Sequence, residues 1–138
     1  MKREILFRAK RTNFNEWVFG DLINYSENEI KIIDQNCRCW DILEGGYDVI
    51  PETVGQYTGK TTKNESLCYY DVKKLFEGDI FTIGDSKTTY LCVFENYEWI
   101  GISTDCDKYG QYNIRLASIK DQFYVIGNIH DNPELLNK

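Results

Sequence analysis

The chain has 138 residues, of which 16 are Lys or Arg and 22 are Asp or Glu, so its formal net charge is −6. This balance argues against non-specific binding to duplex DNA or to anionic membrane surfaces, because both need a basic footprint. An acidic surface suits solubility and protein partners instead. No apolar run follows Met1, so we expect neither a signal peptide nor a transmembrane span.

Five cysteines are present, and their spacing does not match a usual zinc site. Cys37 and Cys39 form a Cys-x-Cys pair, the other three stand alone, and the single histidine is remote from all of them. We therefore predict reduced thiols in the cytosol, with no metal and no cofactor.

Alternating apolar residues predict strands in the first third of the chain. Residues 5–9 form one such strand, and 17–19 with 22–23 read as a hairpin that turns at Gly20-Asp21. Residues 30–33 begin another strand, and 47–50 are extended into Pro51.

Two stretches, 49–59 and 76–80, organise the rest of the chain. Pro51 has no N–H group and cannot sit in a central strand, while it favours an extended Ile50. Both stretches carry glycine beside large apolar residues, as close backbone approach requires. We predict that 54–57 packs against 76–80 and joins the N-terminal part to the C-terminal part. Structural roles are accordingly expected for Pro51, Gly55, Gly59, Gly78, Asp79 and Pro133.

The second half of the chain has clearer elements. Residues 60–66 read as an exposed loop, and 71–76 as one helical turn capped by Asp71. Five short strands follow, at 80–83, 88–94, 98–102, 112–117 and 122–126. Tight turns between short strands suit a small barrel. Near the end, Asn132 and Pro133 favour a short helical turn that Asn132 caps.

Catalytic motifs are weak throughout. The segment 55–61 has one residue too few for a phosphate-binding loop, and its first glycine would fall on Val54. Glu77 and Asp79 supply too few ligands for a metal and read as turn residues. His130, the only histidine, is interpreted as a packing or partly exposed side chain. We expect no enzymatic activity.

Aromatic and polar side chains give the candidate binding residues. Gln56, Tyr57 and Thr58 could supply polar and stacking contacts to a ligand. Exposed rings could dock a peptide or stack on bases. The ring candidates for the site are Tyr69, Tyr70, Trp99 and Tyr109, and Tyr97 is a further ring in the same group of strands and turns.

Five motifs, in this order along the chain, resemble the YopX family of phage and prophage proteins. They are REILFRA (3–9), FGDL (19–22), PETVGQYTG (51–59), FEGDI (76–80) and VIGNIHDNPELL (125–136). One departure is residues 65–72, which look like an insertion before the Glu-Gly-Asp turn.

The resemblance implies a mainly β fold, with an irregular β-rich N-terminal part packed on a C-terminal SH3-like small β-barrel that ends in a short helical turn. We expect a single YopX-like domain over 1–138, with a β subdomain at 1–64 and the barrel subdomain at 65–138. The family offers no activity that could be carried over.

Three hypotheses about function follow. The first is a non-enzymatic phage-type protein that binds a host or phage protein in the bacterial cytosol, with interference with a bacterial defence system as one form. The alternatives are a small-molecule or nucleotide-binding, signal-sequestering protein, and a single-stranded nucleic-acid-binding module. Homo-oligomerisation stays open.

Overall fold

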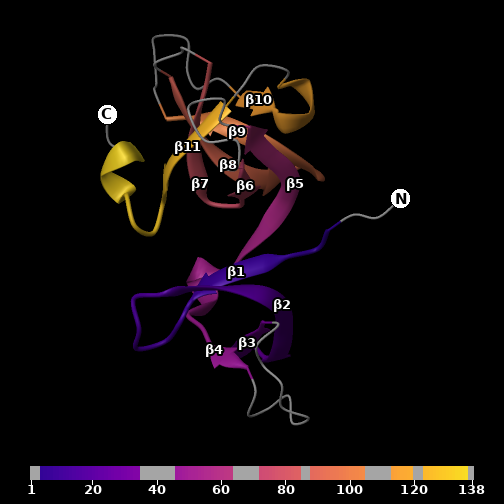
Figure 1. Ribbon diagram of the computed structural model, residues 1–138, viewed down its shortest axis with the longest axis vertical. Helices are drawn as coiled ribbons and strands as arrows, with labels where there is room; N and C mark the ends of the chain where they lie inside the picture. The colour runs from indigo at the N-terminus through magenta and orange to yellow at the C-terminus, as the bar shows by residue number, and fades with distance from the viewer. Residues whose placement is uncertain are drawn as a thin grey trace. The chain divides into compact units, whose positions relative to one another are not determined.

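A computed structural model describes residues 4–34, 46–63, 72–84, 88–104, 113–119 and 123–136. The chain divides into two compact units, Met1–Tyr57 and Thr58–Lys138. The boundary falls inside strand β5 (Gly55–Lys63), which runs from the first unit into the second. Strands dominate the described parts, with a few short 3₁₀ turns beside them (Figure 1), which confirms the prediction of a mainly β fold.

Each unit contains several strands and at least one 3₁₀ turn. The first unit contains β1 (Phe7–Lys10), β2 (Trp17–Ser26), β3 (Glu29–Ile33), β4 (Tyr47–Asp48) and the 3₁₀ turn η1 (Pro51–Thr53). The second contains β6 (Val72–Phe76), β7 (Asp79–Ile83), β8 (Thr89–Glu95), β9 (Glu98–Ser103), β10 (Asn113–Arg115), η2 (Leu116–Ser118), β11 (Phe123–Asn128) and η3 (Pro133–Leu136).

The strands form two sheets, and every pair with a described register is antiparallel. One sheet has the order β4-β3-β2-β1-β5-β6, and the other has the order β10-β9-β8-β7-β11. The closed SH3-like barrel is not confirmed, because β10 and β11 lie at the two open edges of the five-stranded sheet. Strand β10 has only three residues, since η2 follows it directly and buries Leu116.

The predicted hairpin with a turn at Gly20-Asp21 is wrong, because strand β2 continues through these residues. β2 is one continuous strand of ten residues, whose first part pairs with β1 and whose second part pairs with β3. Gly20 lies where the pairing changes from β1 to β3, and a Cβ added there would overlap the Ile33 carbonyl group. The glycine therefore marks a close approach of two strands rather than a turn.

The first unit has its own small core, made by one face of its sheet. Its buried members are Ala9, Val18, Ile32 and Val49. Ala9 and Val18 face each other across β1 and β2. Pro51 begins η1 after the extended Ile50, as its chemistry predicts, and the buried Thr53 accepts the Lys10 backbone N–H at 2.9 Å.

Two further predictions in the middle of the chain are wrong. Residues 60–63 belong to β5 rather than to a loop, and residues 72–76 form strand β6 rather than a helical turn. The Thr58 hydroxyl donates to the Leu75 carbonyl at 2.9 Å, and both Leu75 and Phe76 are buried. Burial of these side chains outweighs the weak local preference for a helix. Residues 64–71 lie outside the described ranges.

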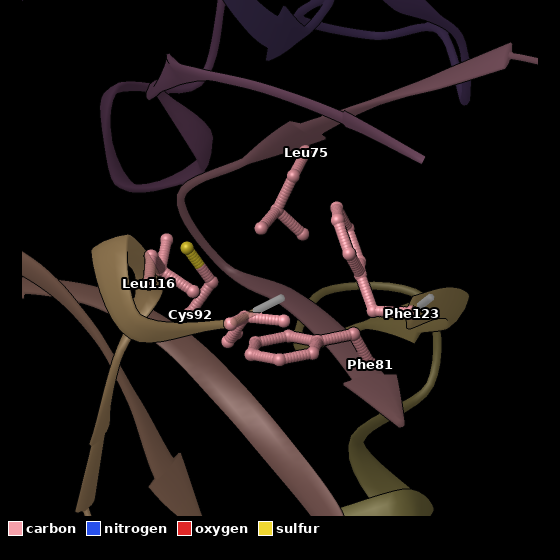
Figure 2. Packing of buried hydrophobic residues seen from close by; sticks show 6 residues of the cluster. Leu75, Phe81, Cys92, Leu116 and Phe123 are labelled. Atoms are coloured by element: carbon pink, nitrogen blue, oxygen red, sulfur yellow. The ribbon is translucent and has the colours of Figure 1, made fainter. Parts of the chain in front are cut away.

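The core of the second unit gathers side chains from β6, β7, β8, η2 and β11. Its buried members are Leu75, Phe81, Cys92, Leu116, Ile119 and Phe123. Figure 2 shows Leu75, Phe81, Cys92 and Phe123 pointing toward one another, and the Phe81 and Phe123 rings meet edge to face at 5.9 Å. Cys92 is a free, buried thiol in this core.

The C-terminal motif is held by side-chain hydrogen bonds. The Asn128 Oδ1 atom accepts the backbone N–H groups of His130 (3.0 Å) and Asp131 (2.9 Å). Pro133 begins the short turn η3, as predicted. The Asn132 side chain does not cap this turn as expected from the sequence; it accepts the Asn128 N–H at 3.2 Å, and its backbone carbonyl accepts the Leu135 N–H.

Replacing Gly20 by Ala should lower the free energy of unfolding by about 3 kcal/mol, because the new Cβ would lie 2.7 Å from the Ile33 carbonyl carbon. Chemical denaturation measures this change. Gly84→Ala is the matched control: space is open around Gly84, so only its φ of 53° matters, at about 1 kcal/mol. If Gly20→Ala and Gly84→Ala lowered the free energy of unfolding equally, β2 would not approach β3 as closely as described.

Lys60 in β5 is far from η2 in sequence, yet its side chain contacts and stabilises this turn. Its Nζ atom donates to the carbonyl groups of Leu116 (3.2 Å) and Ile119 (3.0 Å). Lys60→Met keeps the aliphatic stem but removes the charged donor from both carbonyls, of which, among the described residues, only that of Leu116 keeps another donor, the Ile119 N–H. We therefore expect a loss of roughly 1–3 kcal/mol in thermal or chemical melts. The exposed Lys74, changed to Met, should shift stability by less than about 0.5 kcal/mol. If the Lys60→Met and Lys74→Met variants were equally stable, the hydrogen bonds of Lys60 would not stabilise η2.

Candidate binding surface

The turn between β8 and β9 has an unusual backbone. Glu95 and Glu98 face each other, and only Asn96 (φ 52°) and Tyr97 (φ 66°) connect them. Two consecutive positive φ values define a type I′ turn, whose second position strongly favours glycine. A side chain in the left-handed region costs about 1–2 kcal/mol. Tyr97 adopts this unfavourable backbone conformation although the residue is 97% exposed.

Two more aromatic rings lie directly beside this turn. Phe94 and Trp99 face each other across the strands, and their rings meet edge to face with centroids 5.0 Å apart. Trp99 also packs against the core of the second unit, whereas Phe94 is 52% exposed. We call Phe94, Tyr97 and Trp99 the aromatic tip. Its exposed rings, Phe94 and Tyr97, are thus connected through Trp99 to the core of the second unit.

A pair of carboxylates lies next to the turn in sequence. Glu95 and Glu98 are directly opposite each other, an arrangement of like charges that destabilises a sheet. Glu98 is compensated by Arg115, whose Nε lies 3.1 Å from its Oε2. Because side chains alternate along a strand, this acidic pair lies on the sheet face opposite the Phe94 and Trp99 rings, and only Glu98 of the pair has Arg115 beside it.

The structure places the three predicted polar binding residues on successive positions of β5. Gln56 pairs with Phe7 of β1 and is half-buried. Tyr57 is only 4% exposed, and Thr58 donates its hydroxyl to the Leu75 carbonyl. Burial and backbone bonding favour a structural role for Tyr57 and Thr58.

The predicted structural glycines occupy different environments. Gly55 is buried and pairs with Arg8. Gly59 (φ 91°) and Gly78 (φ 90°) have left-handed backbone that favours glycine. Beside Gly78, the buried Asp79 accepts the Phe76 N–H at 2.7 Å and so fixes the turn between β6 and β7.

Sequence reasoning names Tyr97 and Trp99 among the rings that could dock a peptide or stack on bases, and it selects Trp99 as a site residue. It misses Phe94, because nothing local shows that this ring extends past the core. The detectable signal was Asn96-Tyr97 at a position where Asn-Gly is usual. Tyr69, Tyr70 and Tyr109 lie outside the described residues.

The described residues offer little for metal chemistry. Among them, no group of three or more His, Cys, Asp or Glu side chains could hold a metal ion. His130 is half-buried near Gly78, in the C-terminal motif. No helix in the described ranges is both long and apolar enough to cross a membrane.

These features define a mainly β protein whose second unit carries an exposed aromatic hairpin turn. The family model described as "YopX protein" matches residues 6–137, so the chain belongs to the YopX family. This membership confirms the resemblance and identifies a phage-type protein. No curated protein and no solved structure gives a significant match.

Tyr97→Gly should raise the free energy of unfolding by about 1 kcal/mol, because glycine relieves the left-handed backbone conformation. In thermal melts this gain corresponds to a midpoint about 3 °C higher. Tyr97→Ala removes the exposed ring but keeps the unfavourable φ, so its stability should stay near the wild type. A destabilised Tyr97→Gly variant would show that the ring supports the fold.

Proposed function

We propose that this YopX-family protein is a non-enzymatic phage-type protein that binds a host or phage protein through the aromatic tip. The observation that carries the proposal is Tyr97, which is 97% exposed and held at a φ of 66°. An exposed ring at this backbone position costs stability and gains no burial in the folded chain. Such a cost is explained by a role outside folding.

The composition of the aromatic tip supports a protein partner. Tyr, Trp and Phe are enriched in the buried centres of protein interfaces, where they fill pockets on the partner. Trp99 packs on the core, so this ring of the tip is held in place before binding and loses little entropy when a partner binds. The neighbouring Tyr97 and Phe94 offer the exposed apolar area.

The charges near the aromatic tip indicate what kind of partner surface would fit it. Glu95 and Glu98 lie on the sheet face opposite the Phe94 and Trp99 rings, Arg115 pairs with Glu98, and the whole chain has a net charge of −6. A partner with an apolar pocket for the rings and a basic residue that reaches Glu95 would be complementary to this hairpin. Such complementarity speeds association and sets orientation more than it adds affinity.

The phage-type family supplies the biological setting. A small binding protein without a catalytic constellation suits interference with a bacterial protein, and a defence system in the host cytosol is the form of target that we favour. The structure of the tip supports binding, and the identity of the target is part of the proposal.

Affinity capture from bacterial host lysate tests the proposed function. Wild-type protein should retain a partner in stoichiometric amounts, and Tyr97→Gly should retain at least about tenfold less, as expected for an interface hot spot worth 1.4 kcal/mol or more. Tyr25→Ala is the matched control, since Tyr25 is an exposed ring (37%) in the first unit. A partner retained equally by Tyr97→Gly, or no partner under several conditions, would contradict the proposal.

A further inference from the structure

The β1–β2 hairpin of the first unit places cations beside aromatic rings. Side chains alternate along a strand, so Ala9 and Val18 point into the core while Lys10 and Trp17 share the opposite face. Lys10 faces Trp17, and Arg8 faces Phe19. The Trp17 ring centroid lies 4.7 Å from the Arg8 Cζ atom and 5.6 Å from the Lys10 Nζ atom.

A second cation–aromatic group lies where the same hairpin turns. The Arg11 Cζ atom is 4.1 Å from the Phe14 ring centroid and 4.7 Å from that of Tyr47. These distances are typical of cation–π contacts. The two groups lie on different faces of the sheet: Lys10 and Trp17 face away from the core, whereas Tyr47 packs against it. Together we call them the cation–aromatic strip, which consists of Arg8, Lys10, Arg11, Phe14, Trp17 and Tyr47.

The turn presents Phe14 to solvent on a fixed backbone. The Arg11 N–H donates to the Glu16 carbonyl at 2.9 Å, and the Lys10 Nζ donates to the Asn15 side chain at 2.9 Å. Phe14 is 55% exposed although its ring is in contact with Arg11. A large part of the ring is therefore accessible to another planar group.

Three cations lie close together in the strip. Arg8, Lys10 and Arg11 lie within four residues, and the Arg11 Nη1 atom is 3.4 Å from the Glu16 Oε2 atom. Arg8 is only 9% exposed, so it holds Trp17 and contributes positive potential rather than direct contacts. Lys10 and Arg11 are more accessible and could reach an anion.

We propose that the cation–aromatic strip binds single-stranded nucleic acid. Bases stack on the exposed face of Phe14, and the phosphates beside them contact Lys10 and Arg11. This combination of stacking rings and backbone-neutralising cations is how proteins hold single strands without sequence preference. A duplex hides the faces of its bases and needs a broader basic surface than this acidic chain offers. The site is independent of the aromatic tip.

Fluorescence anisotropy with labelled oligothymidylate and oligouridylate of about 12 nucleotides tests the proposal on the full chain. We expect saturable binding at about 50 mM NaCl. Phe14→Leu should weaken it at least about fivefold through lost stacking. Lys10→Gln should reduce the slope of log K against log salt by about 0.7, the value for one phosphate contact on a single strand.

Tyr25→Leu is the matched control, because Tyr25 is an exposed ring (37%) outside both the strip and the aromatic tip, and its variant should leave oligonucleotide binding unchanged. Phe14 is exposed, so its variant is expected to fold, and thermal melts verify this. The proposal is overturned if neither strand binds at about 100 μM protein, the weak limit of non-specific binding. It is also overturned if Phe14→Leu binds as tightly as wild type, or if a duplex of equal length binds better.

Discussion

The two-residue turn at Asn96 and Tyr97 is the constraint on which the candidate binding surface depends. Because both residues have positive φ, β8 and β9 are joined by the shortest hairpin loop, and Glu95 must face Glu98. That register also sets Phe94 opposite Trp99. A slip of one residue would turn these rings to the other face of the sheet. The turn thus connects the exposed Tyr97 to the packed core of the second unit.

Much of the fold was predictable, because the strands of the second unit carry local alternation. Strands β7, β8, β9 and β11 lie close to the predicted ranges. Predictions from the sequence are wrong at places where packing between distant residues determines the structure. Gly20-Asp21 looks like a turn, yet the missing side chain serves the approach of β2 to Ile33. Residues 72–76 have a weak helical preference that burial of Leu75 and Phe76 overrides.

The candidate site was only partly predictable. Trp99 stands out as an aromatic residue in a strand, but the exposure of Phe94 depends on where the core ends. The cation–aromatic strip was missed because its contacts join residues across strands. Lys10 and Trp17 are seven positions apart in sequence and become neighbours only through the register of β1 and β2. Pairing across a sheet is a property that spacing along a single strand does not contain.

The most direct test of the central claim is photo-crosslinking in host cells that produce the protein with a photoreactive phenylalanine analogue at one position. We predict that the analogue at position 97 forms a covalent adduct with one host or phage protein, and that the analogue at position 25, an exposed ring of the first unit, does not. An adduct at position 25 without one at position 97 would contradict the assignment of the aromatic tip as the partner-binding surface.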